Sequence, residues 1–86
     1  MFYTYILLSK TTNKFYIGST GNIQDRFSRH NAGRSKATKS GIPWIMVYYE
    51  EFQTRSEAML RETEIKSWKS HERIQSFIDK KVAQSG

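Results

Sequence analysis

Apolar and aromatic residues of this chain gather in short stretches that are separated by polar residues. Residues 2–8 and 14–19 are rich in aromatic and β-branched types, and the polar residues between them are typical of a turn. This pattern predicts a β-hairpin in which Tyr5 and Tyr16 approach each other across the two strands. The apolar and aromatic stretch at residues 44–52 predicts a third strand that is largely buried.

Helical signals follow the second stretch. Asn22 is a suitable N-cap, Asp25 lies in the first turn and Gly33 is a typical stop, so a helix is expected over about residues 23–31. Residues 32–43 are rich in Gly, Ser, Thr and Lys. A polar segment of this length indicates a functional loop rather than a simple connection between two elements.

Two further helices are predicted in the C-terminal part of the chain. The sequence Thr54-Arg55-Ser56-Glu57 has the pattern of a capping box and opens a helix that runs to about Trp68. A last helix starts at Ser70 with apolar residues on one face, and residues 80–86 are expected to form a frayed tail. The order β-β-α-β-α-α predicts an α+β fold, in which a small three-stranded antiparallel sheet packs on about three helices and exposes the tyrosine hairpin on one face.

Length and composition narrow the class of protein. The 86 residues fit a single domain over residues 1–86, with an ordered core over about residues 2–80. Because no apolar run could span a membrane and the N-terminus lacks a basic signal-peptide start, a cytoplasmic protein without a membrane partner is expected. The absence of cysteine excludes disulfides and thiolate metal sites, so any metal would be a hard ion such as magnesium or manganese.

The charge favours a nucleic-acid partner. Fourteen Lys and Arg against eight Asp and Glu give a net charge of +6 and a pI near 9.8. In the loop, Arg34, Lys36 and Lys39 supply cations beside hydroxyl and backbone donors, as a phosphate-backbone contact needs. The alternative for both observations is a basic surface that is only solvated.

Glu62 is a carboxylate in an unexpected place. At about 100° per residue, Ala58, Met59, Glu62 and Ile65 share one arc of the helix that is expected to face the sheet. Burial of an unpaired carboxylate is costly, so such a residue is usually paired with a base or bound to a metal. A structural salt bridge and a metal site are therefore both open for Glu62.

Arg26 and His30 lie one helical turn apart and therefore project together. The planar guanidinium of Arg26 can donate two parallel hydrogen bonds to a phosphate and stabilise the charge that develops in the transition state. His30 could orient the attacking water or protonate the leaving oxygen. Without further information, Tyr5 and Tyr16 would be read as aromatic residues that pack in the core.

The order of these residues resembles the GIY-YIG nuclease superfamily, and most closely its small stand-alone bacterial members. Tyr16-Ile17-Gly18 is a literal second motif, whereas Tyr3-Thr4-Tyr5 stands where the first motif would be, so that only Tyr5 carries over. The resemblance runs from about Phe2 to Ile78. Three further segments extend it, namely residues 25–31, 41–44 and 61–66.

The resemblance implies a metal-dependent endonuclease that hydrolyses DNA phosphodiester bonds with one magnesium or manganese ion held by Glu62. It implies catalytic roles for Arg26 and His30, a role for Tyr16 in activating the water, and a role for Tyr5 in holding the scissile phosphate. A tyrosine pKa of about 10 would require a nearby cation or metal for this chemistry. DNA repair or structure-selective cleavage follows only by analogy.

One departure from the family pattern keeps other functions open. Many larger members carry an asparagine beyond the metal glutamate, but this chain has no asparagine after Asn31. Either the small members dispense with it or the protein is a weak catalyst. The alternatives are a non-catalytic nucleic-acid-binding module that retains the fold, and a module that binds another protein.

Overall fold

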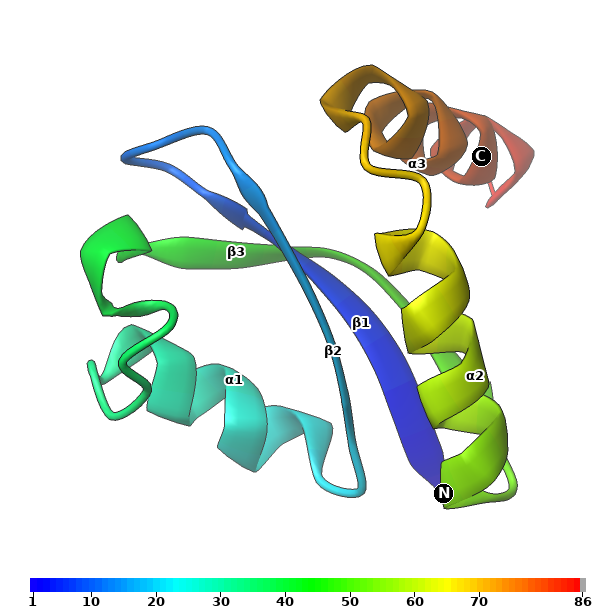
Figure 1. Ribbon diagram of the computed structural model, residues 1–86, viewed down its shortest axis with the longest axis horizontal. Helices are drawn as coiled ribbons and strands as arrows, with labels where there is room; N and C mark the ends of the chain where they lie inside the picture. Colours follow the sequence, from blue (N-terminus) through cyan, green and yellow to red (C-terminus); the bar gives the residue numbers. More distant parts are fainter. Residues whose placement is uncertain (86) are drawn as a thin grey trace.

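The computed structural model describes residues 1–85, with side chains described through Val82. The chain order confirms the predicted β-β-α-β-α-α arrangement, with one short 3-10 turn added before the last strand (Figure 1). The elements are β1 Phe2–Ser9, β2 Phe15–Thr20, α1 Ile23–Asn31, η1 Lys39–Gly41, β3 Trp44–Phe52, α2 Arg55–Lys66 and α3 His71–Ser85. None of the helices described over these residues is long and apolar enough to cross a membrane.

The three strands form an antiparallel sheet in the order β2-β1-β3, so the N-terminal strand is central. Residues 4–7 of β1 are all buried, which corrects the expectation of an exposed tyrosine hairpin at Tyr5. The expectation of a largely buried third strand was also wrong, because β3 is an edge strand in which only Trp44 is buried. Alternation along β1 supplies side chains to both faces of the sheet.

Helices cover both faces of the sheet (Figure 1). On one face, Tyr5, Leu7 and Trp44 form a core with partly buried residues of β2, α1 and the following loop. On the other face, Ile6 and Ile17 pack with buried isoleucines of α2 and α3. The sheet therefore lies between α1 on one side and α2 with α3 on the other.

The helix starts follow the predicted capping chemistry, and the last helix is longer than predicted. The Asn22 side chain accepts from the backbone of Asp25 at 3.1 Å, and Thr54 and Glu57 form a reciprocal capping box. The prediction of a frayed tail over residues 80–86 was wrong for residues 80–85, because α3 continues to Ser85. Gly86 lies outside the described residues. No Gly or Pro interrupts residues 79–85, so local sequence does not stop the helix.

The polar loop after α1 is tied firmly to the sheet. Asn31 accepts from the Trp44 backbone N–H at 2.6 Å and donates to the Trp44 carbonyl at 3.0 Å. Trp44 Nε1 donates to the Thr38 carbonyl at 2.7 Å, and Ser9 Oγ donates to the Gly41 carbonyl at 2.6 Å. The Ile42–Pro43 peptide bond that leads into β3 is cis. These bonds make the loop a fixed wall beside α1.

Candidate functional site

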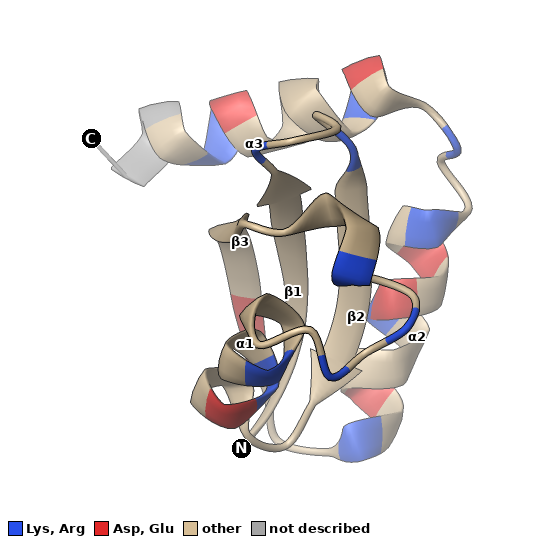
Figure 2. Cartoon of the chain, turned by 90° about the vertical axis from the view of Figure 1, so that its left-hand side faces the viewer, with Lys and Arg blue, Asp and Glu red and all other residues tan. Residues whose placement is uncertain are grey.

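A cleft of about 440 Å³ opens between α1 and the loop that follows it. Figure 2 shows basic residues along both segments. The lining residues are Tyr16, Asp25, Arg26, Arg29, His30, Arg34 and Ser35. Asp25 and Arg29 form an i,i+4 ion pair at 2.9 Å, so three arginines and one aspartate leave the lining with a net charge of +2. The cleft therefore attracts an anionic ligand.

A buried chain of polar side chains lies behind this cleft. Tyr5 Oη lies 2.9 Å from His30 Nε2, and His30 Nδ1 lies 2.8 Å from Thr38 Oγ1. All three residues are at most 2% exposed. Both ring nitrogens of His30 thus have hydrogen-bond partners in either tautomer, which fixes the orientation of the ring.

Burial keeps both titratable members of this chain neutral. Desolvation lowers the pKa of His30, and the positive charge of Arg26 lowers it further. Desolvation also raises the pKa of Tyr5 far above its usual value; Tyr16 adds to the rise, whereas Arg26 opposes it. At neutral pH the pair therefore consists of a phenol and a neutral imidazole, and Tyr5 is not a proton acceptor.

Gly18 explains how Tyr5 reaches His30. The two residues Tyr5 and Gly18 are directly opposite in the β1–β2 register. A Cβ atom on Gly18 would lie 2.5 Å from Tyr5 Oη and 2.7 Å from Tyr5 Cζ, so only glycine leaves room for the phenol to cross the neighbouring strand. The glycine of the Tyr-Ile-Gly sequence is therefore a packing requirement of the buried tyrosine.

Tyr16 links the buried chain to the cleft. It lies opposite Leu7, which places it on the same face of the sheet as Tyr5. The Tyr16 ring centroid lies 6.4 Å from that of Tyr5 and 5.0 Å from that of His30. The predicted approach of the two tyrosines is thus a diagonal contact across the hairpin. Tyr16 is half-buried and forms part of the cleft wall.

Glu62 lies on the opposite side of β2, outside the residues that line the cleft. Its carboxylate accepts from Ser19 Oγ at 2.6 Å and from Lys66 Nζ at 2.5 Å. Its side chain is 21% exposed, so the salt bridge considered as an alternative is present at a partly open position. Burial is the main cause of the raised pKa of Tyr5, and the negative charge of Glu62 adds a small part to it.

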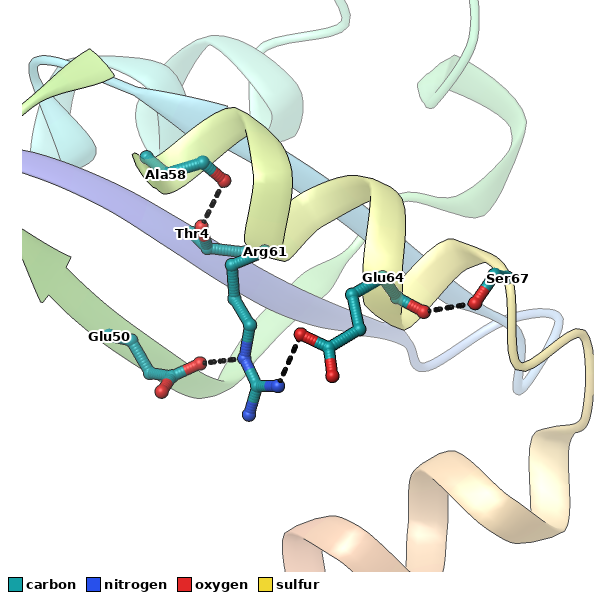
Figure 3. A network of polar contacts seen from close by, with 6 residues as sticks. All are labelled: Thr4, Glu50, Ala58, Arg61, Glu64 and Ser67. Carbon is teal, nitrogen blue, oxygen red and sulfur yellow. Dashed lines mark hydrogen bonds and ion pairs between the residues drawn. The ribbon is translucent and has the colours of Figure 1, made fainter. Parts of the chain in front are cut away.

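Helix α2, which carries Glu62, is fastened to the sheet by polar contacts on both sides (Figure 3). Thr4 Oγ1 donates to the Ala58 carbonyl at 2.6 Å, and Arg61 donates to Glu50 on β3 at 2.7 Å and to Glu64 at 3.0 Å. The predicted apolar arc of α2 holds for Ala58 and Ile65. It was wrong for Met59, which is 53% exposed.

At this site a metal ion could be bound by one protein carboxylate, that of Glu62. Among the described residues, no group of three His, Cys, Asp or Glu side chains is close enough to hold a metal ion. Magnesium is commonly held by one or two carboxylates together with waters and substrate phosphates. Glu62, whose side chain is 21% exposed, and the half-buried Ser19 fit that mode, in which the substrate completes the coordination.

The structure brings Tyr5, Tyr16, Arg26 and His30 together and places Arg34 in the same cleft. The cleft lining does not include Lys36 and Lys39, which are exposed on the loop beyond it. The sequence did not reveal three hydrogen-bond partners of the candidate site residues. These are Thr38, which contacts His30, and Ser19 and Lys66, which contact Glu62. The i,i+4 spacing from Glu62 could have revealed Lys66, whereas the hydroxyl partners come from distant segments and carry no local signal.

Comparisons of the sequence and the structure identify related proteins. The sequence model of the GIY-YIG catalytic domain matches residues 1–75. A UPF0213 protein of Staphylococcus haemolyticus is 42% identical over 79 residues, which cover 91% of this chain and 95% of the relative. A UPF0213 protein of Haloquadratum walsbyi is 38% identical over 77% of this chain and 76% of its own. The solution NMR structure of a UPF0213 protein from Bacillus halodurans superposes with a TM-score of 0.58 at 30% identity, covering 92% of this chain and 84% of that one.

Proposed function

The chain belongs to the GIY-YIG catalytic domain family, and from this premise we propose that it is a divalent-metal-dependent endonuclease that hydrolyses DNA phosphodiester bonds. The observation that carries the proposal is the cleft in which an exposed arginine, Arg26, stands beside Tyr16 and in front of the buried Tyr5–His30 pair. A role in DNA repair or structure-selective cleavage is proposed by analogy with the family.

In this mechanism, Arg26 binds the scissile phosphate through its planar fork and stabilises the negative charge that develops on the phosphoryl oxygens. Arg34, on the facing loop, contacts a neighbouring phosphate. These two cations, which lie on separate segments, hold the backbone in the cleft. Burial lowers the pKa of His30 and keeps it neutral, and the positive charge of Arg26 lowers this pKa further.

The hydroxyl of Tyr16 orients the attacking water on the open side of the cleft. The oxygen of this water forms a bond to phosphorus as the ester P–O bond breaks. The water releases one proton to the solvent, and the leaving oxygen takes up one proton from the solvent. Tyr5 and His30 are buried, so they act by fixing the position of the site: Thr38 orients His30, and His30 orients the Tyr5 hydroxyl behind the cleft.

Glu62 is the residue that would hold a divalent ion, assisted by the hydroxyl of Ser19. Such an ion, when bound, supplies Lewis-acid stabilisation to a phosphate oxygen. Lys66 already donates a hydrogen bond to one carboxylate oxygen of Glu62. When a metal ion and substrate bind, this lysine must therefore either move away or keep its hydrogen bond to a carboxylate that also binds the ion.

A cleavage assay tests the proposal. Purified protein is incubated with labelled duplex, branched and single-stranded DNA in magnesium or manganese. Arg26→Ala should lower the cleavage rate by at least about 100-fold while weakening binding far less, because the guanidinium contributes most in the transition state. Arg26→Lys should restore little, since an ammonium cannot reproduce the bidentate fork.

Two controls separate the roles of the charges. Arg29→Ala, on the same helix but paired with Asp25, should change the rate by less than about tenfold. Glu62→Gln should abolish metal-dependent cleavage, whereas Glu64→Gln, which is exposed and paired with Arg61, should not. If Arg26→Ala lowers rate and affinity by the same factor, Arg26 only holds DNA.

The second candidate is a non-catalytic nucleic-acid-binding domain. It is favoured by one specific observation, that both oxygens of Glu62 already have hydrogen-bond donors from the protein. This candidate predicts salt-sensitive DNA binding without cleavage of any substrate in either metal. That result would replace the nuclease proposal.

A further inference from the structure

A second groove lies on the α2–α3 side of the sheet, where the β1–β2 turn meets the end of α2 and the start of α3. Its volume is about 320 Å³, near the lower end of the roughly 300–1,000 Å³ that small-ligand sites occupy. Phe15 lines it beside Ile17 and Ile74, which are both less than 9% exposed. We call it the hairpin groove. It is separate from the cleft, because the two share no lining residue.

Three lysines from three different segments border the hairpin groove. Lys14 comes from the β1–β2 turn, Lys66 from the last turn of α2, and Lys69 from the α2–α3 connection. Of these three, only Lys66 forms an ion pair with another described residue, Glu62. The groove thus combines an apolar floor with a cationic rim, a combination that is complementary to a flat apolar ring flanked by phosphates.

An exposed aromatic ring is held in place at this rim. The ring of His71 stacks on that of Phe15 with centroids 4.5 Å apart and an interplanar angle of 32°. His71 Nε2 lies 2.9 Å from the carbonyl oxygen of Asn13, to which it donates. Phe15 supports one face of the imidazole, and His71 as a whole is exposed. A fixed, exposed ring of this kind is what a nucleobase requires for stacking.

The backbone at the rim is held in an unfavourable conformation. Lys69 has φ 50° and Asn13 has φ 60°, and these are the non-glycine residues with positive φ in the described part of the chain. Asparagine tolerates this region, but a lysine there is uncommon. Glycine would be the easier residue at Lys69, which follows a helix end. Strain of this kind is typical of functional sites.

The hairpin groove leads to the proposed metal carboxylate. Phe15, Ile17 and Ser19 alternate along β2 and therefore face the same side, toward α2. Ser19 contacts Glu62, and Lys66 contacts both Glu62 and the groove. A strand that occupies the groove would thus continue along β2 toward Glu62.

We propose that the hairpin groove binds an unpaired nucleotide of the DNA substrate. The base stacks at His71 and Phe15, and the flanking phosphates contact Lys14 and Lys69. The inference rests on the proposed nuclease function and deepens it, since it names DNA with a single-stranded segment next to the cleavage site as the substrate class.

Equilibrium binding without metal tests this inference independently of cleavage. Fluorescence anisotropy compares a blunt duplex with the same duplex carrying a short single-stranded overhang. His71→Ala should weaken overhang binding by about 5- to 150-fold, as expected when one base loses its stacking partner, and change blunt-duplex binding by less than about threefold. His71→Phe keeps an aromatic ring and should retain most of the overhang affinity.

Two further variants complete the test. Lys69→Gly removes the charge and the backbone strain together, so it should weaken overhang binding while leaving the fold at least as stable. Lys10→Ala removes a lysine of the same turn that is outside the groove lining, and it should affect both DNA molecules equally. Thermal unfolding of each variant verifies that the fold is intact.

The outcomes separate this inference from the nuclease proposal. His71→Ala and Lys69→Gly could leave overhang binding unchanged, or they could weaken the binding of the overhang duplex and of the blunt duplex by the same factor. Either result would show that the hairpin groove does not bind an unpaired nucleotide, whether or not the protein cleaves DNA. If the variants lose overhang binding selectively while the wild type cleaves nothing, the groove binds as inferred and the nuclease proposal fails.

Discussion

Replacement of Gly18 by alanine tests the packing of the site without any substrate. The added methyl carbon would lie 2.5 Å from Tyr5 Oη and 2.7 Å from Tyr5 Cζ. Tyr5 is 1% exposed and cannot swing into solvent. The phenol must therefore move away from Gly18, and this movement disturbs its 2.9 Å contact with His30.

The expected change in the free energy of unfolding is the sum of three contributions. Overpacking of a core costs about 1–3 kcal/mol. A buried hydrogen bond left unsatisfied costs about 1–3 kcal/mol more. The lower entropy of the unfolded chain with alanine offsets about 0.4–1 kcal/mol. Gly18→Ala should therefore lower the free energy of unfolding by about 1–5 kcal/mol. At a central value of about 3 kcal/mol, Tm of a domain of this size falls by roughly 12–24 °C.

Circular dichroism during heating and during urea titration measures this loss. Gly21→Ala is the matched control, because a Cβ there would lie 3.4 Å from the nearest atom of Phe2, and its free energy of unfolding should change by less than about 1 kcal/mol. Tyr5→Phe removes the closest atom, so its combination with Gly18→Ala should be less destabilising than the sum of the two changes by at least about 1 kcal/mol. If Gly18→Ala unfolds at the same Tm as Gly21→Ala, or if the double variant is additive, the steric explanation is refuted.

Two other predictions concern pH and salt. Because burial lowers the pKa of His30 below its unfolded value of 6.5, the unfolded chain takes up a proton first as the pH falls through about 6.5, so the free energy of unfolding is highest above this pH and decreases below it. His30→Gln should reduce the difference between urea unfolding at about pH 7.5 and at about pH 5; an equal pH dependence in the wild type and the variant would contradict the assignment. The combined change Lys36→Ala and Lys39→Ala should flatten the log-log salt dependence of duplex DNA binding by nearly two units, at about 0.9 per lost phosphate contact, and an unchanged slope would remove these lysines from the interface.

Local patterns were sufficient to predict the elements but not their environment. The capping residues Asn22 and Thr54 correctly marked two helix starts, since caps act within a few residues of the chain. The aromatic residues of β3 resembled a buried strand, but strand order is a non-local property, and β3 became an edge. Residues 80–85 looked like a tail because they carry few apolar side chains, yet nothing in them stops a helix.

The candidate site was predictable where it depends on spacing and family resemblance. Arg26 and His30 share a helical face, so their common direction follows from the period of the helix. The burial of His30 and its contact with Thr38 depend on how the loop folds back over α1, which no local pattern specifies. The separation of Glu62 from the cleft by β2 likewise required the position of the strand in the sheet.

The central position of β1 bears on the order in which the chain folds. Tyr5 pairs with Gly18 through a short turn but with Tyr49 only after a much longer segment closes, at an additional entropic cost of about 1 kcal/mol. The hairpin can therefore form early, yet an isolated two-stranded hairpin is at best marginally stable in water. The bonds from Asn31 to Trp44 join α1 to β3, so the cleft wall closes only when the last strand docks. A chain in which β3 has not yet docked would carry both tyrosines and Arg26 but no enclosed cleft, so the proposed reaction would begin only with complete folding.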